Sequence, residues 1–89
     1  MASGATRLAI DSAGGAVLGP GSQTVFVNGL NVSVLGDAVG GHGDGSHSSP
    51  SIITSSSSVY ADGQGVVTSI DVTSCGKNPT GSGDVFIGV

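Results

Sequence analysis

The chain has 89 residues, 17 of them glycine, with no tryptophan and only three aromatic side chains, so we expect a single domain, residues 1–89, with a small aliphatic core. Six aspartates against one arginine and one lysine give a net charge of −4, and so few cations argue against a nucleic-acid partner. No apolar run approaches the ~20 residues of a membrane span and no signal peptide opens the chain, so we expect cytoplasmic synthesis without stable membrane insertion.

A chain this small and this rich in glycine needs stabilisation beyond that of its own core in order to fold. Each ordered residue costs roughly 1–2 kcal/mol of backbone entropy, and glycine loses the most freedom. Small proteins in this position usually add a metal, disulfides or a partner. Because Cys75 is alone, a disulfide within the chain is excluded. A metal, a partner or both remain.

The first predicted elements are a half-hairpin, a loop and a complete β-hairpin. Residues 7–11, RLAID, match the second half of the later hairpins, and a loop covers 12–21. The run 24–27, TVFV, is followed by Asn28-Gly29, a dipeptide typical of tight hairpin turns, and then by a second strand at 32–35. Alternating valines give this hairpin one apolar face.

The same pattern returns in the second half of the chain. After a loop at 38–50, residues 59–61 lead into Asp62-Gly63 and a second apolar run at 66–71. A loop at 72–82 follows, and the ending at 81–88, GSGDVFIG, matches the start of the first hairpin.

These matches predict three related units. Two complete hairpins and two half-hairpins give a pseudo-threefold all-β arrangement in which the chain termini close the third hairpin. The three loops each begin just after an aligned aspartate, so they would gather at one end. Chance similarity among glycine- and serine-rich segments is the alternative.

Three potential metal ligands fall in these loops. Loop 38–50 carries His42 and His47, and loop 72–82 carries Cys75. If the loops meet, two imidazoles and a thiolate form a good zinc site, and the same set suits iron. Alternatively, the histidines are solvated and the cysteine is a small buried hydrophobe.

The repeated GSQTVFVNGLNVSVLGDAV pattern, the loop HGDGSHSSP, Cys75-Gly76 and the ending GSGDVFIGV resemble the PAAR-repeat family. The resemblance covers about residues 8–89. It implies a small cone that caps the trimeric β-helical spike of a contractile phage tail or a type VI secretion system, one tip per trimer. It also implies a metal near the point, typically held by three histidines and a cysteine.

The sequence departs from this pattern in two places. Leu30-Asn31-Val32-Ser33 stands where the family has Pro-Ala-Ala-Arg, and the first loop, 11–15, contains no histidine. Only His42, His47 and Cys75 match the family's ligands, so either Asp44, another aspartate or water supplies the fourth position, or the site is weaker than is usual in the family.

The expected function is therefore mechanical: a metal-stabilised tip, made in the bacterial cytoplasm, that sharpens a spike for piercing the envelope. It would reside in the virion, at the apex of the baseplate spike, or be exported by a type VI secretion system. We expect no enzyme activity, since the chain contains no glutamate and little bulk with which to build a pocket. A small metallohydrolase acting on envelope polymers and a partner-free structural protein or adhesin are the rival hypotheses.

Overall fold

The computed structural model describes residues 2–88, which form short antiparallel strand pairs and a single 3-10 turn. This confirms the all-β prediction. The pairs are β1 with β8, β2 with β5, β3 with β4 and β6 with β7. Their bounds are β1 Ala2–Gly4, β2 Val17–Gly19, β3 Phe26–Val27, β4 Leu30–Asn31, β5 Ala38–Val39, η1 Gly45–His47, β6 Tyr60–Ala61, β7 Gln64–Gly65 and β8 Phe86–Gly88.

Both predicted hairpin turns are present. Asn28 and Gly29 have φ of 54° and 80°, and Asp62 and Gly63 have φ of 52° and 81°. Two successive left-handed residues define the type I′ turn, whose twist matches that of the flanking strands. Asparagine, aspartate and glycine are the residues that adopt this backbone most readily.

The hairpin strands are shorter than the sequence pattern predicts. Instead of continuing along the hairpin, residues 32–35 and 66–71 turn inward and bridge between units. Val34 pairs with Val66, and Arg7 pairs with Val32. The predicted apolar face survives in Val27, Val32 and Val34, which are buried. Val25, which the alternation placed on the same face, is 40% exposed. The alternation was therefore a better guide to burial than to strand length.

A ring of backbone hydrogen bonds joins the three units at the centre of the molecule. The amide of Thr6 donates to Val67 at 2.9 Å, that of Val67 to Ser33 at 3.0 Å, and that of Ser33 to Thr6 at 2.8 Å. All three residues are fully buried. A second set, one layer out, joins the same three units in the opposite cyclic order: Leu8 to Asn31, Leu35 to Gly65 and Ser69 to Gly4. The pseudo-threefold prediction is confirmed.

The ring corrects one detail of the predicted alignment. The sequence match aligns 7–11 with 33–37 and so places Arg7 opposite Ser33, whereas Thr6 occupies the equivalent position in the structure. The turn from Arg7 to Asp11 contains one more residue than its two counterparts, and Ala9 in that turn has a φ of 70°. A single inserted residue in a turn shifts the register of everything before it.

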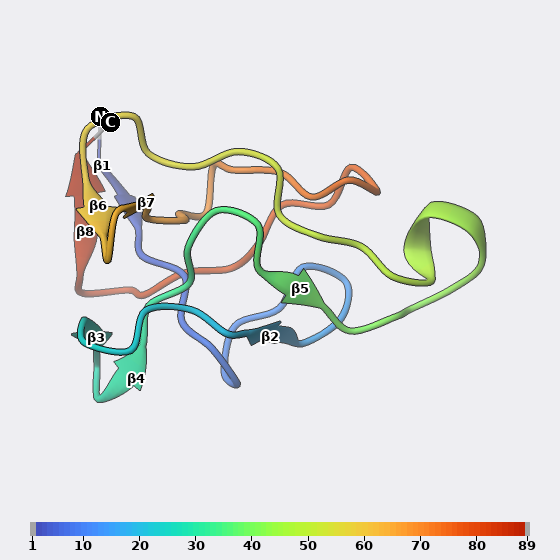
Figure 1. Cartoon of the computed structure of the whole chain (residues 1–89), viewed down its shortest axis with the longest axis horizontal. Helices are drawn as coiled ribbons and strands as arrows, with labels where there is room; N and C mark the ends of the chain where they lie inside the picture. The colour runs from blue at the N-terminus through green and yellow to red at the C-terminus, as the bar shows by residue number, and fades with distance from the viewer. Residues whose placement is uncertain (1, 89) are drawn as a thin grey trace.

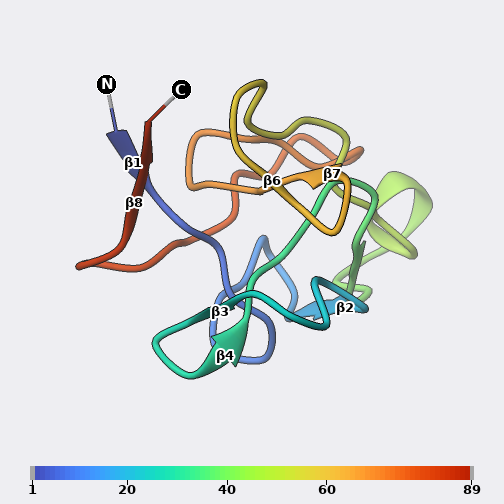
Figure 2. The ribbon, with the colours of Figure 1, turned by 60° about the vertical axis from the view of Figure 1, so that its left-hand side comes forward.

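The third unit is closed by the two ends of the chain, as predicted. β1 and β8 pair antiparallel, with Ser3 opposite Ile87 and Gly4 opposite Phe86. Figures 1 and 2 show this pair beside the other two hairpins, with the termini close together. The strand that pairs is 2–4 rather than the predicted 7–11, which forms the turn that follows.

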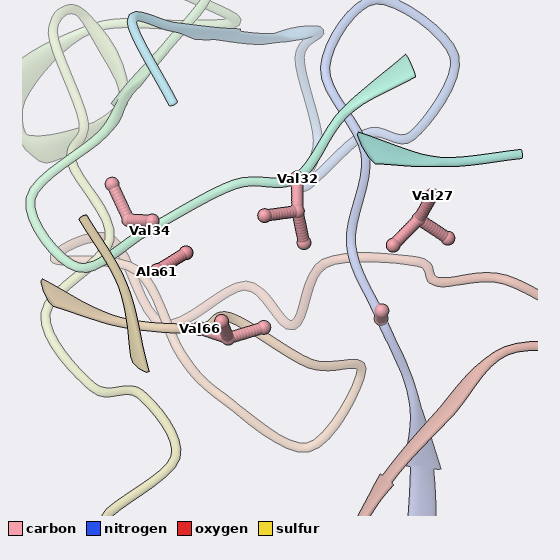
Figure 3. Packing of buried hydrophobic residues seen from close by; sticks show 6 residues of the cluster. Val27, Val32, Val34, Ala61 and Val66 are labelled. Atoms are coloured by element: carbon pink, nitrogen blue, oxygen red, sulfur yellow. The ribbon is translucent and has the colours of Figure 1, made fainter. Parts of the chain in front are cut away.

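Buried side chains gather in two clusters. The first lies between the hairpins, and Figure 3 shows its small aliphatic side chains pointing toward one another. Its members are Ala5, Val27, Val32, Val34, Ala61 and Val66, with Val59, Val85 and Ile87 packed against them. The second cluster lies beyond the central ring and contains Ala13, Val17, Val39, Ile52 and Val67, with Leu8 against it.

The molecule is longer along one axis, with extents of 32 × 24 × 24 Å. The hairpins β3–β4, β6–β7 and the pair β1–β8 lie at one end of this axis, which we call the hairpin end (Figure 1). The loop that carries η1 lies at the opposite end, which we call the loop end. Among residues 2–88 no helix is long and apolar enough to cross a membrane.

Candidate metal centre

The loop after β5 folds back on itself and brings its two histidines together. The amide of His42 donates to the carbonyl of His47 at 2.8 Å, and the amide of His47 donates to the carbonyl of Asp44 at 3.2 Å. Gly45, with a φ of 63°, supplies the backbone bend that begins η1. The glycines of this loop therefore allow a turn tight enough for the rings to meet, with centroids 5.0 Å apart.

The third ligand arrives from the next loop along the chain. The amide of Ser74 donates to the carbonyl of Ser51 at 2.8 Å, which fixes loop 72–82 against the return of loop 38–50. A tight turn closed by the amide of Gly76 on the carbonyl of Thr73 then presents Cys75. Its Sγ lies 3.5 Å from Nε2 of His42, although 33 residues separate the two in sequence.

Two of the three distances between the donor atoms match the edges of a tetrahedral metal site. Nδ1 of His47 lies 3.1 Å from Nε2 of His42, and the three donor atoms all lie within 4.8 Å of one another. Zinc bonds of about 2.0–2.1 Å to nitrogen and about 2.3 Å to sulfur give tetrahedral edges of about 3.3 Å between nitrogens and about 3.6 Å from nitrogen to sulfur. The distances from His42 to His47 and from His42 to Cys75 thus fit a zinc-sized cation.

Neighbouring groups place two of the candidate ligands, His42 and Cys75, in the protonation state that binds a metal. Nδ1 of His42 lies 3.1 Å from the carbonyl of Gly40, which can only accept, so Nδ1 carries the proton and Nε2 presents its lone pair to the site. The Thr73 hydroxyl, 3.2 Å from Sγ, is the main cause that lowers the pKa of Cys75 to about 6. Burial opposes this effect, and the backbone of Lys77 and the two histidines lower the pKa by smaller amounts. The thiol is therefore largely thiolate at neutral pH, the form that binds metal.

The first loop contributes backbone in place of a side chain. A β-carbon at Gly14 would lie 2.7 Å from Nε2 of His42, and one at Gly15 would collide with the carbonyl of Gly40. Gly14 also has a φ of 87°, which side chains rarely tolerate. Gly14 and Gly15 thus form a wall against the His42 ring, so that the three loops do meet at this end.

All three residues expected as ligands come together, but the expected candidate for the fourth does not. No carboxylate among residues 2–88 joins the group, and Asp44 is exposed outside it. Sequence reasoning missed Gly14 and Thr73, which shape the site without binding. Their signals are slight: a glycine pair in a loop and a threonine two residues before the cysteine.

Comparison with protein families finds a match over most of the chain. The model of the PAAR motif matches residues 9–78, which is most of the chain. The chain belongs to the PAAR-motif family. A search of the curated proteins finds no match.

Membership of the PAAR-motif family places the chain among spike-tip proteins of the puncturing apparatus of phage tails or type VI secretion systems. Proteins of this family are structural and sit on the tip of a trimeric spike. The matched segment contains all three units in part, including the loops that carry His42, His47 and Cys75.

Proposed function

We propose that one copy of this PAAR-motif protein caps one trimeric β-helical spike, with its hairpin end against the spike and its loop end as the point. The observation that carries the proposal is a set of three exposed aromatic side chains at equivalent positions. Phe26, Tyr60 and Phe86 are the first residues of β3, β6 and β8, and their exposed fractions are 56%, 61% and 56%.

These three positions repeat because the hairpins alternate in the same way. In β3 and β6 the aromatic residue faces out and the next residue, Val27 or Ala61, is buried in the cluster between the hairpins. Ile87 packs against the same cluster after Phe86. Large exposed apolar side chains in a protein this small mark an interaction surface, and aromatic residues are favoured in interfaces.

A threefold surface is best satisfied by a threefold partner. Each chain of a spike trimer would meet one aromatic residue of the cap, so a monomer makes three nearly equivalent contacts. The cap would also cover the exposed strand ends of the spike, which otherwise invite pairing with other chains.

In the same proposal, His42, His47 and Cys75 hold a zinc ion, with iron as the alternative, at the loop end. The ion ties loop 38–50 to loop 72–82 across a part of the chain that has few large apolar side chains to bury. Because coordination forms only in the folded state, its binding energy stabilises the fold. The role requires no turnover, and the protein would act in the virion or as part of a secretion system.

Size-exclusion chromatography with light scattering, using the cognate spike, tests the docking. We expect one cap per three spike chains, and Phe26→Asp should weaken the complex at least about tenfold, since it buries a charge in the interface. Ile70→Asp is the matched control, because Ile70 is 58% exposed but lies in a turn outside the three hairpins. Equal loss in both variants, or no complex with wild type, would contradict the proposal.

Metal analysis of the purified chain separately tests the proposed metal bound by His42, His47 and Cys75, which we call the clamp. The expected result is about one zinc or iron per chain in the wild type and its loss in His42→Ala and Cys75→Ala, with a lower melting temperature. Wild-type protein free of metal, with both variants equally stable, would remove the clamp from the proposal and leave the docking untouched.

A further inference from the structure

Among the residues that the structure describes, the candidate metal centre has three protein ligands and no fourth. The chain contains two histidines, one cysteine and no glutamate, so among the usual zinc-binding side chains only an aspartate could complete the set. Five of the six aspartates are engaged elsewhere. Asp11, Asp37 and Asp71 accept hydrogen bonds within their own turns, and Asp62 and Asp84 accept hydrogen bonds from Ser22 and Ser82 at the start of β-hairpin units.

The sixth aspartate is equally unsuited. Asp44 precedes η1 with an extended backbone, its side chain is exposed, and its carboxylate does not come within the 4.8 Å group of donors. The first loop cannot substitute, because Gly14 and Gly15 present only backbone to the His42 ring and have no room for a side chain.

Solvent reaches the site. His42, His47 and Cys75 are each half-buried rather than enclosed. Structural zinc sites are almost always closed by four protein ligands, whereas a site with three keeps a position for a ligand from solution.

We propose that the metal held by His42, His47 and Cys75 keeps an exchangeable fourth position, filled by water at rest and open to small anions and thiols. The inference rests on the proposed metal site. Exchange is a ligand substitution: the incoming donor gives a lone pair to the metal as water leaves, and no electron is transferred. The ligand class follows from the half-buried opening, which admits small donors, and from the thiolate already present, which favours metals that accept soft ligands.

Cobalt(II) is the probe, since its visible absorption reports coordination number and ligand type. The full chain is loaded with one cobalt and titrated with azide and, separately, with 2-mercaptoethanol. We expect the cobalt bands to shift in a saturable way with one ligand per metal, and the thiol to add intensity in the sulfur-to-cobalt region. Asp44→Ala should give the same spectrum and the same titration as wild type.

Three results would overturn the inference, and they are distinguishable. Cobalt bound at one per chain with a spectrum unmoved by azide and thiol would mean a closed site, which leaves the proposed clamp intact. A changed resting spectrum in Asp44→Ala would make Asp44 the fourth ligand. Failure to bind cobalt or zinc at all would remove the clamp as well. Cys75→Ala, which should lose the sulfur-to-cobalt band, verifies that the bands come from this site.

Discussion

Single glycines decide where the metal-binding side chains can lie. Gly14 has the left-handed backbone that glycine adopts at little cost, and it also leaves the space that the His42 ring occupies. Substitution therefore has two separable effects: strain in the backbone and displacement of the ring. Gly36 has nearly the same φ, 92° against 87°, but nothing lies within 4 Å of the β-carbon it would gain.

We expect Gly14→Ala and Gly36→Ala to lose similar stability, about 1–2 kcal/mol from the left-handed backbone alone. Only Gly14→Ala should weaken zinc binding, by at least about tenfold, because the His42 ring must move away from His47 and Cys75. Denaturant unfolding of the metal-free chains measures the first effect and competition with a chelator measures the second. Equal zinc affinity in the two variants would show that the wall does not position His42.

The buried aspartates also act locally, each within its own turn. In each of the three turns that end at Asp11, Asp37 and Asp71, one carboxylate oxygen accepts a backbone amide three or four residues earlier. Burial raises the pKa of Asp11, but hydrogen bonds and an ion pair from Arg7, with the hydroxyl of Thr80, outweigh it, so its pKa lies below the usual value. A lowered folded-state pKa gives stability that is present above the unfolded pKa and is lost as pH falls through the folded one.

The free energy of unfolding should therefore fall in the wild type as the pH drops below about 4, the usual pKa of an aspartate. Asp11→Asn should be less stable at pH 7 and should show a shallower fall over this range, because it has one fewer proton to take up. Denaturant titrations at several pH values make the measurement. Asp44→Asn, with an exposed side chain, is the control and should follow the wild-type curve. A wild-type slope in Asp11→Asn would contradict the assignment.

Among the three units, the element that repeats most faithfully is a serine turn before each hairpin. Ser22, Ser56 and Ser82 are buried, and each Oγ accepts the amides two and three residues later. Ser22 in turn donates to Asp62, and Ser82 donates to Asn28, so a hairpin turn of one unit is held by the serine turn of another. The hairpins are therefore fastened to one another at their tips as well as through the core.

Replacing any one of these serines by alanine should destabilise the protein by about 1–3 kcal/mol, since two amides lose their acceptor. The losses at Ser22 and Ser82 should be at least as large as the loss at Ser56, because these two hydroxyls also donate to a hairpin turn of another unit. Ser57→Ala is the matched control: it neighbours Ser56, is exposed, and should change little. Thermal unfolding followed by circular dichroism provides the comparison. One large loss and two negligible ones would mean that the turns are not equivalent in energy.

The elements also show what the sequence could and could not predict. Asn28-Gly29 and Asp62-Gly63 predicted their turns because backbone preference at those positions is local. The extent of the strands, the β2–β5 pair and the alignment of Thr6 with Ser33 were missed, since each depends on contacts between units. The three metal-binding residues were found from side-chain chemistry and from a family resemblance. The role of Gly14 was missed because Gly14 contributes no side chain and only leaves space for the His42 ring.

In the molecule as a whole, the hairpin end and the loop end are separate structures joined by the central ring. The aromatic residues lie on the hairpins, whereas the donors lie on the loops at the far end of a 32 Å axis (Figure 1). Each end has its own apolar cluster. Docking and metal binding should therefore vary independently, apart from any shared dependence on folding.

Removing the metal should lower the melting temperature by several degrees yet leave the affinity for the spike within about threefold, provided the chain stays folded. Calorimetry with and without a chelator measures the first, and a binding titration of the spike at low temperature measures the second. Cys75→Ser should behave like the chelated protein in both. A large loss of affinity in chelated but folded protein would contradict independence of the two ends.

The antiparallel pairing of β1 with β8 makes the backbone almost a closed loop, with the break falling where the other two units have a tight turn. Topologically, the position of that break is arbitrary. A circular permutant that links the old ends through a short glycine-containing segment and opens instead between Asn28 and Gly29 should fold to the same body. In such a rearranged chain both new ends would emerge from a different corner of the same three-sided face.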